Sequence, residues 1–222
     1  MKLKEILIRK FVVDRFTKLY YHSRPRIWNN TFWFGVPIGK CPPDLWTYQE
    51  IIFETRPDII IECGTGTGGS ALFLAQHCDL MHHGRVITID IKDIPNRPVH
   101  ERISYITGSS IAEQTLRQIQ EMISNTDTVL VILDSDHSKD HVLKELNLYC
   151  DLITPGNYII VEDTIIGGHP VKPHRKPGPM EAVKEFLKTH KNFEIDKSRE
   201  KFYLTFNRNG YLKKFDRNIT ER

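Results

Sequence analysis

The chain has 222 residues, of which 40% are hydrophobic and 27% are charged, which predicts one domain with a sizeable core. A formal net charge of +3 is too small to indicate a nucleic-acid-binding protein. The four cysteines form no C-x-x-C pair, so we expect buried free thiols in a reducing compartment and a cytoplasmic protein.

The first twenty residues predict a basic amphipathic helix. Arg9 and Lys10 interrupt its apolar run, so it cannot serve as the core of a signal peptide or as a membrane span. We expect the helix to dock on the domain or on a second subunit of a homo-oligomer, with adsorption to an anionic membrane surface as the alternative. Residues 1–50 are therefore assigned to a helical and aromatic extension, 51–210 to the main domain and 211–222 to a tail.

From residue 58 onward, strand and helix patterns alternate with short connections. This alternation predicts a mostly parallel sheet with helices on both faces. Only residues 197–201 separate the last two strands, too few for a parallel crossover, so the last strand should be antiparallel. Together these features predict a Rossmann-like, class I methyltransferase fold with seven strands. The strands are expected at 58–63, 85–91, 103–107, 129–134, 158–163, 193–196 and 202–206, and the helices at 69–78, 111–124, 138–150 and 179–189.

A glycine-rich loop, residues 62–70 (ECGTGTGGS), follows the first strand. It satisfies G-x-G-x-x-G, and Asp90 stands where the dinucleotide fingerprint has an acid, which indicates a nucleotide-like ligand close to the backbone. A tight strand-to-helix turn is the purely structural alternative.

The residues around this loop favour S-adenosylmethionine over NAD. Glu62 would repel a pyrophosphate but could attract the ammonium group of S-adenosylmethionine, and Asp90 can accept hydrogen bonds from ribose hydroxyls. Gly108, Ser109 and Ser110, after the third strand, should lie near the adenine. The expected cofactor-binding residues are Glu62, Gly64, Thr65, Gly66, Ser70, Asp90, Ser109 and Asp134.

Acidic residues follow two of the predicted strands, in VLVILDSDH and in YIIVED. The carboxyl ends of parallel strands form the ligand crevice of such sheets, and crowded carboxylates repel one another, so a bound cation is expected. Oxygen ligands suit Mg²⁺ or a similar hard cation. We expect Asp136, Glu162 and Asp163 as metal ligands, with Asp134 as the alternative to Asp136. An acid cluster neutralised by Lys or Arg is the structural alternative.

Methyl transfer to a hydroxyl group requires removal or weakening of its proton, which a bound divalent cation achieves by lowering the hydroxyl pKa. Asp136 and His137 are the expected catalytic residues. His137 is either a general base or a helix N-terminal residue hydrogen-bonded to Asp134. Residues 165–180, rich in Gly, Pro, His and basic residues, are either a lid that meets the substrate or an exposed irregular loop.

The chain resembles the cephalosporin hydroxylase/rhamnosyl O-methyltransferase family over residues 32–206. The resemblance implies S-adenosylmethionine and Mg²⁺ as ligands, metal carboxylates at Asp136, Glu162 and Asp163, and a cleft bordered by Lys40 and Tyr48. The segments that carry the resemblance are FGVPIGKCPP, DLWTYQEI, IIECGTGTGGSA, LDSDHSKDHVLKELNLY and LITPGNYIIVEDT.

We therefore expect a Mg²⁺-dependent S-adenosylmethionine O-methyltransferase that acts on a hydroxyl group of a small molecule or sugar. The alternatives are an NAD(P)-dependent oxidoreductase and a scaffold that binds S-adenosylmethionine without turnover. The acids at both strand ends argue against the scaffold.

Overall fold

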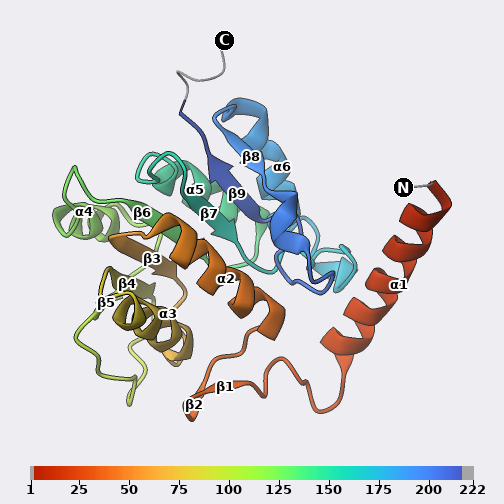
Figure 1. Cartoon of the computed structure of the whole chain (residues 1–222), viewed down its shortest axis with the longest axis horizontal. Helices are drawn as coiled ribbons and strands as arrows, with labels where there is room; N and C mark the ends of the chain where they lie inside the picture. The colour runs from red at the N-terminus through yellow and green to blue at the C-terminus, as the bar shows by residue number, and fades with distance from the viewer. Residues whose placement is uncertain (1–2, 217–222) are drawn as a thin grey trace.

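A seven-stranded sheet in the order β5-β4-β3-β6-β7-β9-β8 is the centre of the computed structural model, which describes residues 3–216 (Figure 1). β9 runs antiparallel to its neighbours β7 and β8, and the other pairings are parallel. This order and the single antiparallel strand confirm the expected class I methyltransferase fold. The strands are β3 Ile59–Cys63, β4 Arg85–Asp90, β5 Ile103–Thr107, β6 Val129–Leu133, β7 Tyr158–Val161, β8 Phe193–Ile195 and β9 Tyr211–Lys214.

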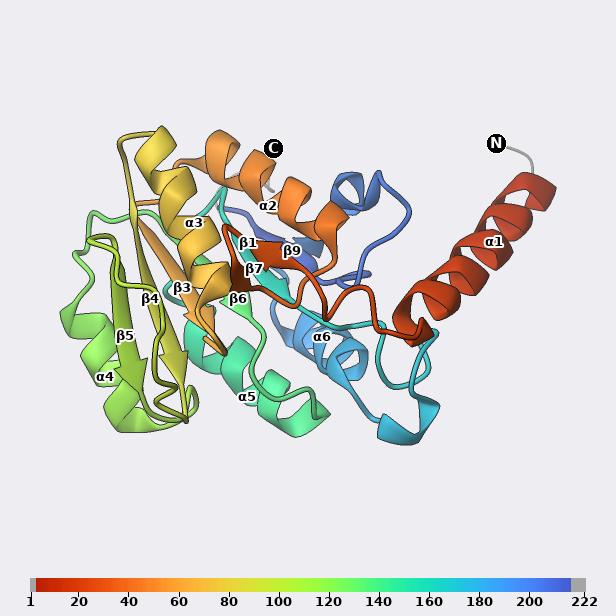
Figure 2. The same cartoon turned by 90° about the horizontal axis from the view of Figure 1, so that it is seen from below.

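The two central strands are apolar on both faces because helices cover both sides of the sheet. Every residue of β3 and β6 is buried. α2 (Pro42–Thr55) and α3 (Gly69–Leu80) pack on one face, while α4 (Glu113–Glu121), α5 (Lys139–Tyr149) and α6 (Pro179–Thr189) pack on the other, as Figure 2 shows. Two short strands, β1 Phe32–Trp33 and β2 Val36–Pro37, form a hairpin beside α3.

The N-terminal helix α1 (Leu3–His22) leans away from the sheet (Figures 1 and 2). Its contacts with the domain include the ion pair of Asp14 with Arg208 at 2.6 Å, the cation–π contact of Arg9 with the Tyr203 ring, and the buried side chains of Thr17 and Tyr21. Docking on a second subunit, like the cytoplasmic location, stays a prediction. No described helix is long and apolar enough to cross a bilayer. The exposed apolar side chains of α1 are Ile6, Leu7, Ile8, Phe11, Val12, Phe16 and Leu19.

The first six predicted strands of the large sheet agree with the structure within two residues, but the seventh is wrong. Residues 202–206 form no strand, because Tyr203 has a positive φ of 65° and Phe206 packs against Tyr21 instead. The antiparallel strand is β9, inside the segment that we assigned to the tail. The assigned domain boundary at residue 50 likewise falls inside α2, while residues 217–222 lie outside the described part.

Candidate active site

Two adjoining cavities lie at the carboxyl ends of the parallel strands. One of about 450 Å³ is bordered by Gly66, Asp90 and Ser110, and the other, of about 240 Å³, by Lys40 and Thr65. Both are bordered by Gly64 and Asp134. A larger hollow of about 790 Å³ lies at the opposite edge, where β3 and β4 begin, and ligands of such sheets bind at the carboxyl edge instead.

Gly64 holds the glycine loop directly against the end of β6. Its φ of 104° is unfavourable for other residues, and a Cβ at this position would overlap the carbonyl oxygen of Asp134. The Asp134 amide also donates to the Cys63 carbonyl at 2.7 Å. Gly66, with φ 51°, has open space around its missing side chain. The first glycine therefore sets the distance between two strand ends, whereas the second leaves room for a ligand.

Replacing Gly64 by Ala is expected to lower the free energy of unfolding by more than about 3 kcal/mol, because backbone overlap adds to conformational strain. Gly66→Ala is the matched control, since it introduces positive-φ strain without a neighbour and should cost about 1 kcal/mol. Urea unfolding of both variants measures the difference. Equal losses would contradict the packing role of Gly64.

Glu62, the last but one residue of β3, is buried beside this loop. Its Oε2 accepts a hydrogen bond from Thr88 Oγ1 at 2.6 Å, while Oε1 has no hydrogen-bond partner among residues 3–216. Burial raises the pKa of Glu62, and the nearby Lys40 ammonium opposes that shift. A buried carboxylate oxygen without a donor is costly, so it indicates that a ligand supplies one.

Asp90, Thr65 and Ser70 lie around the same loop, as expected. Asp90 accepts hydrogen bonds from the backbone amides of Gly66 and Lys92, both at 2.9 Å, and borders the larger cavity. Thr65 and Ser70 are buried and line the smaller cavity, and Thr65 Oγ1 lies 2.7 Å from Thr88 Oγ1.

Ser110 borders the larger cavity, whereas Ser109, which we expected there, does not line it. Ser110 Oγ donates to Glu145 Oε1 at 2.6 Å, as does Ser135 Oγ, and the His141 ring nitrogen lies 3.4 Å from the same oxygen. The sequence did not reveal the contacts of Glu145 with Ser110, Ser135 and His141. An acid between Val142 and Leu146 on the buried side of α5 was the available signal.

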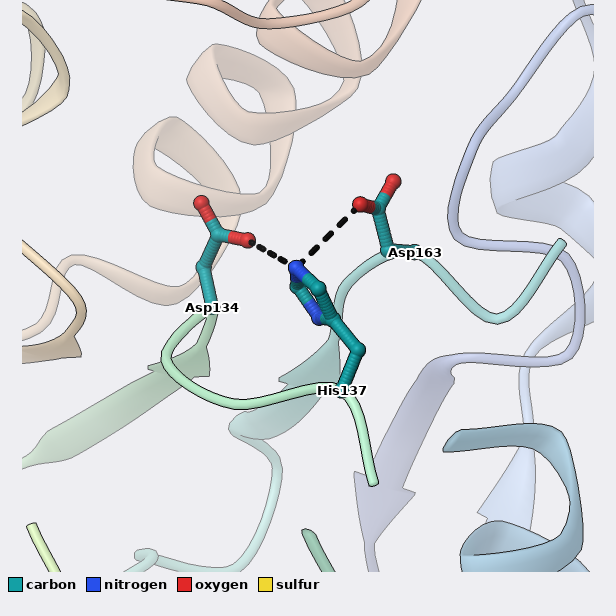
Figure 3. A group of neighbouring side chains, drawn as sticks. All are labelled: Asp134, His137 and Asp163. Atoms are coloured by element: carbon teal, nitrogen blue, oxygen red, sulfur yellow. Dashed lines mark ion pairs between the residues drawn. The ribbon is translucent and has the colours of Figure 1, made fainter. Parts of the chain in front are cut away.

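Asp134, His137 and Asp163 form the metal-compatible cluster of the described chain (Figure 3). One potential ligand atom from each lies within 4.8 Å of the others. His137 Nε2 is 3.3 Å from Asp163 Oδ2 and 3.9 Å from Asp134 Oδ1. Asp163 reaches the cluster because the chain leaves the sheet there with a φ of 54°, as convergence of neighbouring strand residues requires.

Lys40 connects this cluster to Glu162. Its ammonium, on a side chain that is only 6% exposed, lies 2.6 Å from Glu162 Oε1 and donates to Asp134 Oδ2. Burial lowers the pKa of Lys40, but the carboxylates of Asp134 and Glu162 outweigh burial, and the net pKa is raised. Burial and the Asp134 charge raise the pKa of Glu162. Lys40 lies 94 residues before Asp134, so no local pattern could reveal the contact.

Glu162 and Asp136, two of the three metal ligands that we expected, are not part of this cluster, and the expected metal set stays a prediction. Asp136 makes a different contact. Its Oδ1 accepts a hydrogen bond from the Ser138 amide at 2.7 Å, at the start of α5, and this bonding lowers the Asp136 pKa. Asp136 borders the larger cavity instead. The alternative that the sequence left open, Asp134, is the residue that the structure brings to Asp163.

Comparison with known proteins places the chain in context. The profile of the rhamnosyl O-methyltransferase/CmcI family matches residues 25–215. The rhamnosyl O-methyltransferase of Mycobacterium leprae is 38% identical over 209 residues, which are 90% of this chain and 90% of that protein.

Solved structures share the fold at low sequence identity. An apo-structure of CmcI has a TM-score of 0.67 at 22% identity and covers 85% of this chain and 77% of its own. A CmcI structure with Mg and SAM has a TM-score of 0.65 at 21% identity and covers 85% of this chain and 78% of its own.

Proposed function

Because the chain belongs to the rhamnosyl O-methyltransferase/CmcI family, we propose that it transfers a methyl group from S-adenosylmethionine to a sugar hydroxyl group, with Mg²⁺ as its metal. The observation that carries the proposal is the contact between two parts of the site: the glycine loop after β3, and the acidic residues that follow β6 and β7. Gly64 of the cofactor loop packs against Asp134, which belongs to the acidic cluster. A donor held by the loop and an acceptor held at the cluster would therefore be neighbours.

The acidic part of the site suits a hard divalent cation. Asp134, Glu162 and Asp163 would hold Mg²⁺ through oxygen ligands, the kind that this ion prefers. A Mg²⁺ ion held there would lower the pKa of the acceptor hydroxyl. His137, with Nε2 at 3.3 Å from Asp163 Oδ2, is placed to take that proton, and Asp163 would stabilise the resulting imidazolium.

The glycine-loop part of the site suits S-adenosylmethionine. Glu62 would accept a hydrogen bond from the ammonium group through its unpaired Oε1, and Asp90 would accept hydrogen bonds from the ribose hydroxyls. Ser110 and His141 border the far part of the larger cavity and would meet the adenine. The open space around Gly66 leaves room for the ligand close to the backbone.

Replacing Glu62 by Gln should weaken the binding of S-adenosylhomocysteine by about 10- to 100-fold, since a hydrogen bond to a charged group contributes about 1.5–3 kcal/mol. Titration calorimetry measures the change. The control ligand is 5′-methylthioadenosine, which lacks the amino-acid part and should bind wild type and variant alike. An equal loss for both ligands would argue against contact between Glu62 and the ammonium group.

The experiment that tests the proposed function is methyl transfer from labelled S-adenosylmethionine to a panel of rhamnosides and other glycosides, with Mg²⁺ or with EDTA. We expect a labelled product only with Mg²⁺. In parallel, thermal unfolding is measured with S-adenosylhomocysteine and with NAD. Only S-adenosylhomocysteine should bind and so stabilise the protein by mass action. Stabilisation by NAD alone would favour an oxidoreductase.

A further inference from the structure

Two segments that meet beside the acidic cluster contain no acidic residue. Neither residues 15–43 nor residues 164–180 include Asp or Glu, although together they hold eight Lys and Arg residues. Tyr21 from the first segment packs in one buried cluster with Ile165, Ile166 and Val171 from the second. Figures 1 and 2 both show the second segment, in cyan to light blue, beside the lower end of α1. The two segments that meet there therefore contribute basic residues and no acid of their own.

Three cations in these segments have no acidic partner. No carboxylate of residues 3–216 lies within 4.0 Å of the charged groups of Arg26, Lys172 or Arg175. The Lys172 ammonium lies 5.2 Å from the centre of the Tyr21 ring, and the Arg175 amide donates to the Lys172 carbonyl in one short turn. Cation–π contact offsets only part of the cost of holding these charges together.

The charges of Arg26, Lys172 and Arg175 interact with one another and with Asp163. Burial lowers the pKa of Lys172, and Arg175 and Arg26 lower it further, while Asp163 acts in the opposite direction. For Tyr21, burial and the Asp163 charge raise the pKa to about 12. Asp163, a proposed metal ligand, therefore influences the pKa of both Lys172 and Tyr21.

The segment that carries Lys172 is held in place by other contacts. Val171 is buried, and the His169 ring lies 2.7 Å from Glu181 Oε1, the acid that Lys176 also approaches at 4.0 Å. Lys172 itself has a positive φ of 45°, a conformation that costs energy for a residue with a side chain. The fold thus holds the backbone of Lys172 and Arg175 in place, while the exposed Arg175 side chain and the Lys172 ammonium have no ion pair with a described residue.

We propose that Arg26, Lys172 and Arg175 bind an anionic group of the methyl acceptor, a carboxylate, sulfate or phosphate, while its hydroxyl group lies at Asp163 and His137. Cations that lie together without acids favour a bound anion, just as crowded carboxylates favour a bound cation. Arginine pairs with such groups through two parallel hydrogen bonds, which also orients the acceptor. The inference rests on the proposed function and specifies the acceptor as an acidic sugar or an acidic glycoside.

The test is thermal unfolding of the full chain with S-adenosylhomocysteine and Mg²⁺ at fixed ionic strength. Glucose, glucuronic acid, glucose 6-sulfate and inorganic sulfate are added separately. We expect each charged sugar to raise Tm by at least about 2 °C more than glucose does. The difference should vanish in Lys172→Met and Arg175→Gln, and persist in Lys184→Met, which removes an exposed lysine from α6.

Each other outcome overturns the proposal. If charged sugars stabilised the protein no more than glucose, or if the preference for charged sugars persisted in both variants, the three cations would not bind the acceptor. Inorganic sulfate that stabilises as much as the charged sugars would reveal a site for free anions only. Stabilisation by S-adenosylhomocysteine alone is measured in parallel, so its absence identifies a failure of the proposed function instead.

Discussion

Replacing Asp134 by Asn is expected to reduce Mg²⁺-dependent methyl transfer by at least about 100-fold, whereas Asp136→Asn should retain activity within about tenfold of wild type. A metal ion supplies several kcal/mol of transition-state stabilisation, and each 1.36 kcal/mol lost is tenfold in rate. Asp134 is the acid that lies with Asp163 and His137. Asp136 instead accepts a hydrogen bond from the Ser138 amide at the start of α5.

Metal binding separates the two variants independently of turnover. Calorimetric titration with Mg²⁺ should show loss of binding in Asp134→Asn and an affinity close to wild type in Asp136→Asn. The second variant should lose only about 1 kcal/mol of stability, the usual net contribution of a single hydrogen bond. Loss of metal binding in Asp136→Asn alone would restore our original assignment.

The sequence was sufficient to predict six of the seven strands of the sheet because their signal is local. The continuous apolar runs of β3 and β6 indicate strands that are covered on both faces. The glycine-rich loop indicates that the first of them runs directly into a helix. The choice between Asp134 and Asp136 could not be predicted, because it depends on how the chain turns after β6. The structure determines that turn through Gly64, whose missing side chain leaves room for the Asp134 carbonyl.

Contacts between distant segments could not be predicted either. Phe202–Phe206 has the apolar pattern of a strand, yet Phe206 contacts Tyr21, and the antiparallel strand begins only at Tyr211. The contacts of Lys40 in the site could not be predicted for the same reason. The resemblance placed Lys40 near the cleft, but only the fold brings its ammonium between Asp134 and Glu162.

Replacing Lys40 by Met should therefore make the stability of the protein depend strongly on metal. The Lys40 ammonium is the cation in contact with Asp134 and Glu162 in the described chain, and Glu62 adds a further negative charge nearby. Removing one partner of a buried ion pair typically costs about 3–5 kcal/mol, because the other charges remain buried and unpaired. We expect a loss of this size in EDTA and a larger stabilisation by Mg²⁺ in the variant than in wild type, since the ion would replace the missing positive charge.

Urea unfolding of both proteins, in EDTA and in saturating Mg²⁺, measures this coupling. Lys201→Met is the control for the loss of a lysine, because it breaks the more exposed pair with Glu50 and should cost less than about 1 kcal/mol in either condition. In the double variant Lys40→Met/Glu162→Gln, the second change removes a carboxylate that the first leaves unpaired, so stability in EDTA should recover in part. If Mg²⁺ stabilised Lys40→Met no more than wild type, Lys40 would not be the cation that balances these acids in the absence of metal.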